Sequence, residues 1–111
     1  MLQIDQIVRG EAKSFKVQIS TVYGPLDLGG YESCGMYLYD NEDFSTPILS
    51  WESSDATRAI FFDRSKGMVQ FFIKNQDTDP LEPKQYPYRM KVQKDSNHTY
   101  TFHQGIIEIK E

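Results

Sequence analysis

The sequence has 111 residues, a usual length for one domain with one hydrophobic core, so we expect residues 1–111 to form a single domain. Its formal net charge of −4 provides no general attraction to phosphate backbones or anionic lipids, and we expect neither a nucleic-acid nor a membrane partner. The one cysteine excludes an internal disulfide and favours folding in a reducing cytoplasm.

Charge is distributed unevenly along the chain. Residues 1–55 contain three basic and nine acidic residues, whereas residues 56–111 contain nine basic and seven acidic residues. If the two halves present different faces, neighbouring copies could pack head to tail. The simpler interpretation, which we prefer, is that folding mixes these charges over one surface.

The first half of the chain shows short apolar and polar alternations separated by turn residues. The first 15 residues include charges and no long apolar run, so we expect neither a signal peptide nor a membrane span there. Aromatic residues make up 14% of the chain, which favours β-structure. We predict strands at residues 4–8, 15–19, 34–39 and 48–51.

The second half continues the same pattern. We predict a strand at 58–63, a tight turn at 65–67 and a central strand in MVQFFIK, which is apolar on nearly both faces. The segment NQDTDPLEP is expected to form a loop. Strands are then predicted at 86–93 and 99–103, followed by a break at Gly105 and a closing strand through Ile107 and Ile109. No stretch has a helical apolar period sustained over three turns, so the expected fold is all-β, with about seven to nine short strands.

The most specific local pattern is LEPKQYPYRMKVQK, residues 81–94. Immunoglobulin-like sandwiches often place a tyrosine at the start of the sixth strand, where its hydroxyl bonds back to the preceding loop. Here Tyr86 would form this structural tyrosine corner after Leu81, and Tyr88 would occupy the core position two residues later. Pro87 removes a ladder donor, so we expect strand pairing on its side to begin only after Tyr88.

The order of motifs resembles the immunoglobulin-like β-sandwich domain of tailed-bacteriophage structural proteins, and is similar to the amino-terminal domain of baseplate upper proteins. The matching segments are VRGEAKSFKVQI, PLDLGGYESCGMYLYD, GMVQFFI, LEPKQYPYRMKV and GIIEI, which is reached from YTFHQG. Together they extend over nearly the whole chain. The resemblance implies an immunoglobulin-like sandwich of two antiparallel sheets.

The resemblance also implies a function. It suggests a virion component that folds in the host cytoplasm and then packs against other virion proteins and copies of itself. No catalysis, cofactor, metal or small-molecule substrate is implied. In baseplate upper proteins the domain is one part of a longer chain with receptor-binding modules. Tail, baseplate, connector and capsid surface therefore all stay open as locations.

Residues that could support catalysis are few. His98 and His103 are five apart in an expected hairpin, without a nucleophile on a recognisable elbow, and we interpret them as surface residues. Cys34 belongs to an apolar alternating set, which is typical of an inert core thiol.

One segment loosely resembles a calcium loop. Asn75, Asp77 and Asp79 alternate in NQDTDP, but the glycine and downstream glutamate of the twelve-residue calcium loop are missing. We interpret these side chains as solvating and capping a loop.

Four aromatic residues fall in or near predicted turns: Trp51, Tyr31, Phe44 and Tyr23. Exposed aromatic side chains form either protein interfaces or stacking platforms for sugars. The alternative function is therefore a carbohydrate-binding module for host-surface glycans. Burial of Trp51 beneath a loop is an equally good interpretation at that position.

Overall fold

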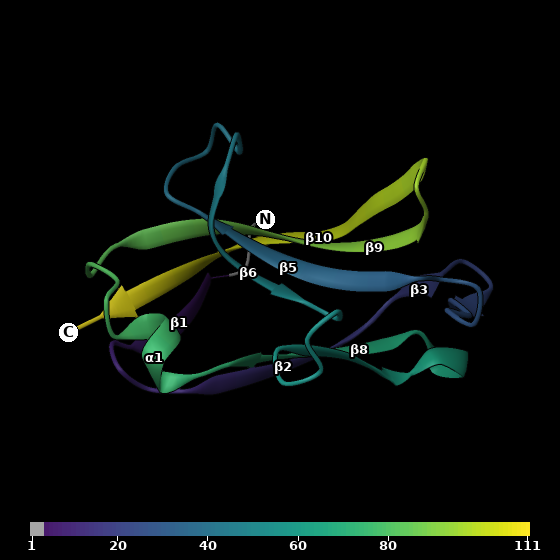
Figure 1. Ribbon diagram of the computed structural model, residues 1–111, viewed down its shortest axis with the longest axis horizontal. Helices are drawn as coiled ribbons and strands as arrows, with labels where there is room; N and C mark the ends of the chain where they lie inside the picture. Colours follow the sequence, from purple (N-terminus) through teal and green to yellow (C-terminus); the bar gives the residue numbers. More distant parts are fainter. Residues whose placement is uncertain (1–3) are drawn as a thin grey trace.

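The computed structural model describes residues 4–111, which form two main β-sheets in separate layers (Figure 1). The larger sheet has the strand order β1-β10-β9-β5-β6 and consists of β1 (Ile4–Val8), β5 (Ser33–Tyr39), β6 (Pro47–Glu52), β9 (Gln85–Asp95) and β10 (His98–Lys110). The smaller sheet has the order β2-β8-β7 and consists of β2 (Lys13–Gln18), β7 (Ala59–Asp63) and β8 (Met68–Ile73).

Three short elements connect these strands. Strands β3 (Ser20–Thr21) and β4 (Gly24–Pro25) form a small hairpin. The 3₁₀ turn η1 (Arg64–Lys66) leads into Gly67, whose φ of 68° is left-handed, so the tight turn predicted here is confirmed. The helix α1 (Asn75–Thr78) is one turn long and lies within the segment expected to be a loop.

The prediction of an all-β fold is confirmed, with corrections. Ten strands are assigned among residues 4–111, more than the seven to nine expected, because the two-residue strands β3 and β4 add a hairpin. The larger sheet is mixed, since β1 runs parallel to β10 with Ile4 opposite Ile106 and Val8 opposite Lys110. The expectation of two purely antiparallel sheets is therefore wrong for this sheet.

The hydrophobic core lies between the two sheets and follows the predicted alternation. In β9, Tyr86, Tyr88, Met90 and Val92 are buried while the residues between them are more exposed. Strand β8 lies in the middle of its sheet, as predicted from its apolar character on both faces. The buried cluster comprises Ile7, Leu28, Cys34, Met36, Leu38, Trp51, Ala59, Val69, Phe71, Ile73, Tyr86, Tyr88, Met90, Val92, Ile107 and Ile109.

The two halves of the sequence are interleaved in space. Strands β9 and β10 of the second half lie between β1 and β5 of the first half, and the smaller sheet likewise combines β2 with β7 and β8. The acidic and basic halves therefore do not form two separate faces, so the simpler interpretation of the charge distribution is the correct one.

Strand β10 does not break at Gly105. It runs from His98 to Lys110 with a β-bulge between Thr101 and His103, and Gly105 lies opposite Tyr88 in β9. A Cβ at Gly105 would lie 2.6 Å from the Tyr88 hydroxyl oxygen. The glycine therefore makes room for the tyrosine and does not end the strand.

Pro87 is accommodated differently on the two sides of β9. The ladder with β10 continues through Pro87, opposite Ile106, as far as Gln85. The ladder with β5 reaches only Tyr88, which lies opposite Leu38. We expected strand pairing to begin only after Tyr88. This expectation is wrong for the β10 side, where Pro87 itself is paired. On the β5 side, pairing begins at Tyr88, one residue earlier than expected.

The helical elements within residues 4–111 are all short. None of them has the length and apolar character needed to cross a bilayer.

Candidate functional site

The predicted tyrosine corner lies at the start of β9. The Tyr86 hydroxyl donates a hydrogen bond of 2.8 Å to the carbonyl oxygen of Glu82, four residues upstream. Tyr86 is buried, and Leu81 packs against the same core. Burial is also the main reason why the pKa of Tyr86 lies above its ordinary value. This contact holds the loop before β9 against the sheet.

Tyr88 lies at the junction of three strands. Its hydroxyl donates to Oδ2 of Asp5 in β1 at 3.3 Å and lies 3.0 Å from Nε2 of His103 in β10. Burial, followed by the nearby Asp5 carboxylate, raises the Tyr88 pKa. The side chain is almost fully buried over Gly105, so its role is to pack and to link the strands.

Trp51 is buried, with 1% of its surface exposed, which removes it from the set of exposed platforms suggested by the sequence. Its Nε1 donates to Oδ2 of Asp77 at 3.1 Å. The same carboxylate accepts the Lys74 backbone N–H and the Arg58 guanidinium, and Arg58 also lies over the indole ring. A buried indole needs a partner for its N–H, and α1 supplies one.

Asp77 is consequently not a solvating loop residue as expected, because it is buried and accepts three hydrogen bonds. It does cap α1 through the Lys74 backbone N–H. The side-chain amide of Asn75 donates a hydrogen bond to the backbone carbonyl of Gly10 and so connects α1 to the turn after β1. Residues 4–111 contain no cluster of three or more histidine, cysteine or carboxylate side chains arranged to hold a metal ion.

The other three candidate aromatics lie apart from one another. Tyr31 packs against the core, and its carbonyl accepts a hydrogen bond from Arg64. Phe44 stacks on Arg89 at 3.6 Å and meets Tyr39 edge to face. Tyr23 is 96% exposed at the tip of the β3–β4 hairpin. The four aromatics that the sequence suggested do not form one platform.

The outer face of the larger sheet, turned away from the smaller sheet, carries aromatic and basic side chains that the sequence analysis did not single out. Tyr37 donates to Oε2 of Glu52 at 3.0 Å, and the Lys91 ammonium lies 5.4 Å from its ring centroid. Burial, with Glu52 beside it, raises the Tyr37 pKa. The alternation of β5 and β9 contained this signal, since Tyr37, Arg89 and Lys91 occupy the positions between buried residues.

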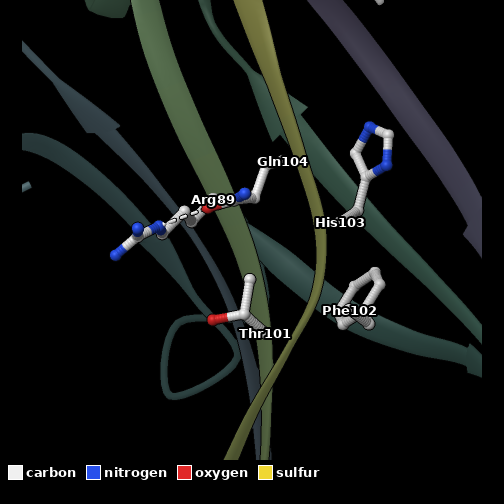
Figure 2. Close-up of a pocket in the computed structure, with 5 residues that line it drawn as sticks. All are labelled: Arg89, Thr101, Phe102, His103 and Gln104. Carbon is white, nitrogen blue, oxygen red and sulfur yellow. Dashed lines mark hydrogen bonds between the residues drawn. The ribbon is translucent and has the colours of Figure 1, made fainter. Parts of the chain in front are cut away.

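Figure 2 shows an open hollow of about 640 Å³ at the bulge of β10, lined by Arg89, Thr101, Phe102, His103 and Gln104. Arg89 and Gln104 lie on one side of the strand and are joined by a 2.6 Å hydrogen bond, while His103 and Phe102 lie on the other side. The bulge interrupts the alternation of side chains between the two faces of β10, so side chains from both faces surround residues 101–104. The hollow is shallow and surrounds a stretch of strand edge.

The two histidines and the cysteine, which are the residues most suited to catalysis, are each engaged in structural contacts or buried. His98 lies 2.7 Å from Asp95 at the exposed hairpin tip, and this contact holds the Asp95 pKa below its ordinary value. His103 contacts Tyr88. Cys34 is buried in β5, and burial raises the pKa of its thiol to about 11, so the unreactive thiol form dominates at neutral pH.

The most distinctive exposed feature is the edge of β10. Strand β1 covers β10 only from Ile106 to Lys110, which leaves the edge of residues 98–105 without a strand partner among residues 4–111. In Figure 1 the β9–β10 hairpin projects beyond the neighbouring strands at one end of the molecule. Unpaired backbone N–H and C=O groups on such an edge can receive another strand.

No family model matches the sequence, and no curated protein matches it.

Proposed function

We propose that the protein is a non-enzymatic structural protein with an immunoglobulin-like β-sandwich, and that it acts through contacts with other proteins. The strand order supports the immunoglobulin-like sandwich, and the β10 edge, uncovered among residues 4–111, supports action through protein contacts. Without the β3–β4 hairpin, the remaining strands correspond in chain order to A, B, C, C′, D, E, F and G. One sheet then contains G-F-C-C′ and the other B-E-D, the partition used by immunoglobulin-like domains.

The tyrosine corner supports the same assignment. In immunoglobulin-like sandwiches this tyrosine lies near the start of strand F and bonds to the backbone a few residues upstream. Tyr86 occupies this position in β9 and bonds to Glu82. The chain departs from antibody domains in two respects: β1 joins the G edge, and Cys34 is the only cysteine, so no disulfide connects the sheets.

Within this proposal the chain is a tailed-bacteriophage virion component, in the tail, baseplate, connector or capsid surface. The sequence resemblance supports this assignment. The exposed β10 edge and the aromatic and basic outer face of the larger sheet are surfaces suited to protein contacts. The partners would be other virion proteins and further copies of this chain.

The test is the composition of purified particles. Virions of a phage that encodes this chain would be purified on a density gradient and analysed by quantitative mass spectrometry. We expect the chain at a constant ratio to the major capsid protein. A replication enzyme of the same phage is the control and should be lost during purification. A chain found only in the soluble lysate would contradict the virion assignment.

A carbohydrate-binding module is the second candidate, and the nearly full exposure of Tyr23 favours it. Because Trp51 is buried, such a module would depend on Tyr23. The purified protein would be screened on a glycan array beside Tyr23→Ala. Saturable binding that is lost in Tyr23→Ala would support this candidate, and the absence of saturable binding would contradict it.

A further inference from the structure

The edge of β10 from His98 to Gly105 differs from every other edge of the two main sheets. This segment reads HTYTFHQG and contains no formally charged residue and no proline. Natural sheets protect their edges with charged residues, proline, bulges or short strands. The bulge at residues 101–103 is the one such device that this edge contains.

The other four edge strands each contain a charged residue or proline. Strand β2 contains Lys13 and Lys16, β6 contains Pro47 and Glu52, β7 contains Asp63 and β1 contains Asp5. These residues oppose the approach of another strand. The lack of such residues is therefore specific to the first half of β10.

We propose that the 98–105 edge of β10 pairs antiparallel with the same edge of a second copy of the chain, around a two-fold axis. The proposal rests on the proposed function and specifies one of its contacts. Pairing would satisfy the backbone groups of both edges at once and would join two larger sheets into one continuous sheet across the dimer.

A second copy fits this edge because the segment is neutral. In antiparallel self-pairing, residues close to the two-fold axis lie near their own copies, so a charge there would meet like charge, and this edge has none to repel its copy. Thr99, Tyr100, Thr101 and Phe102 are residue types that favour strands.

The length of the edge is also suitable. Eight residues of antiparallel strand extend about 27 Å, at about 3.4 Å per residue, which is a typical strand length. Beyond Gly105, β1 occupies the edge and would stop a longer pairing. Two-fold symmetry then limits the contact to two copies, so the pairing closes as a dimer.

The first experiment measures self-association by sedimentation equilibrium from micromolar to millimolar protein. The test variant is Thr99→Lys/Thr101→Lys, which changes two exposed side chains of the edge. The control with the same kind of change is Thr46→Lys, an exposed threonine in the β5–β6 loop. Circular dichroism and thermal unfolding verify that all variants are folded.

We expect the wild type and Thr46→Lys to form dimers with the same dissociation constant. The edge variant should raise this constant at least tenfold, because the paired edges would bring four lysine side chains together, two from each copy. A wild type that stays monomeric at millimolar concentration would overturn the proposal. A dimer unaffected by the edge lysines would also overturn it.

The second experiment locates the two-fold axis with single-cysteine variants at Thr99, Tyr100, Thr101, Phe102 and Gln104. Antiparallel self-pairing brings one position close to its own copy, within the Cβ separation of about 3.5–4.5 Å that a disulfide requires. We expect oxidative cross-linking to peak at one or two adjacent positions and to be absent in Thr46→Cys. The native Cys34 is buried and does not compete. Uniform cross-linking at all positions would overturn the proposed two-fold pairing.

The failure of this inference can be distinguished from failure of the proposed function. If the chain is found in particles but remains monomeric in solution, only the β10 pairing is wrong. If it dimerises through β10 but is absent from particles, only the virion assignment is wrong.

Discussion

The two ends of the molecule handle their polar and apolar groups in opposite ways. At the end covered by α1, the Asp77 carboxylate is buried and accepts bonds from Trp51, Arg58 and Lys74 (Figure 1). At the opposite end, the tip of the β3–β4 hairpin exposes Val22 and Tyr23 almost completely, and the 98–105 edge of β10 has no strand partner among residues 4–111.

The two ends therefore contribute differently to folding stability and to association with a partner. Buried and fully bonded polar groups make one end sensitive to substitution, because each lost partner leaves an unsatisfied group. Exposed apolar side chains contribute little to folding and are available to a partner. We therefore expect stability to depend on the α1 end and association to depend on the hairpin end.

Asp77→Ala should produce the largest loss of stability. The change leaves the Trp51 indole N–H, the Lys74 N–H and the Arg58 guanidinium without their acceptor, at a cost of about 3 kcal/mol. Urea unfolding measures the effect. Asp79→Ala removes an exposed carboxylate from the same segment and should change stability by less than about 0.5 kcal/mol. Equal effects of the two variants would show that the buried Asp77 carboxylate does not stabilise the α1 end.

Gly105→Ala should have the next largest effect. The added Cβ would lie 2.6 Å from the Tyr88 hydroxyl oxygen, and displacing this buried ring should cost about 2 kcal/mol. Gly30→Ala is the matched control, since its Cβ would have nothing within 4 Å. If thermal unfolding shows the same stability for both alanine variants, the packing of Tyr88 does not require a glycine at position 105.

Ionisation of the buried Cys34 thiol should lower the stability of the folded protein at alkaline pH. The thiol pKa is raised from 9.0 to about 11 by burial, so the folded state keeps a proton that the unfolded state loses. The contribution of Cys34 to the free energy of unfolding should be constant well below pH 9 and fall by about 2 kcal/mol by pH 11, since one pKa unit corresponds to about 1.4 kcal/mol.

The comparison protein for this pH experiment is Cys34→Ala. Tyr37, Tyr86 and Tyr88 also have raised pKa values and reduce stability above pH 10 in both proteins, so the difference between the two isolates the thiol. Urea unfolding at a series of pH values should show a shallower decline for Cys34→Ala from pH 9. Identical pH dependences of the two proteins would mean that burial does not raise the pKa of the Cys34 thiol.

Tyr86→Phe should cost about 1 kcal/mol, the usual contribution of one hydrogen bond, because the Glu82 carbonyl loses its donor. Thermal unfolding is the measurement. Tyr100→Phe changes a half-exposed hydroxyl in β10 and should have a smaller effect. No loss in Tyr86→Phe would argue against a stabilising tyrosine corner.

Tyr23→Ser should have the smallest effect on folding, within about 0.5 kcal/mol, because the ring is 96% exposed. Tyr31→Ser removes a ring that packs against the core and should cost distinctly more. A loss above about 1 kcal/mol for Tyr23→Ser would show that the hairpin tip contributes to stability and would weaken the contrast between the two ends.

Local structure could be predicted from the residues alone wherever one face of a strand is buried. Alternation with a period of two located β5, β8 and β9 and their inward residues, because a shift by one residue would turn the whole apolar set towards water. The position of Tyr86 beside its loop was also readable, since the contact with Glu82 extends over only four residues.

Features that depend on partners far away in the chain could not be predicted before the three-dimensional fold was known. Trp51 packs in the core, and Asp77, 26 residues away, accepts its buried N–H. The single turn of α1 that holds Asp77 is too short to produce a helical pattern in the sequence. The parallel pairing of β1 with β10 joins the two ends of the chain. Among residues 4–111, this pairing covers β10 from Ile106 to Lys110, and no other strand covers the 98–105 edge.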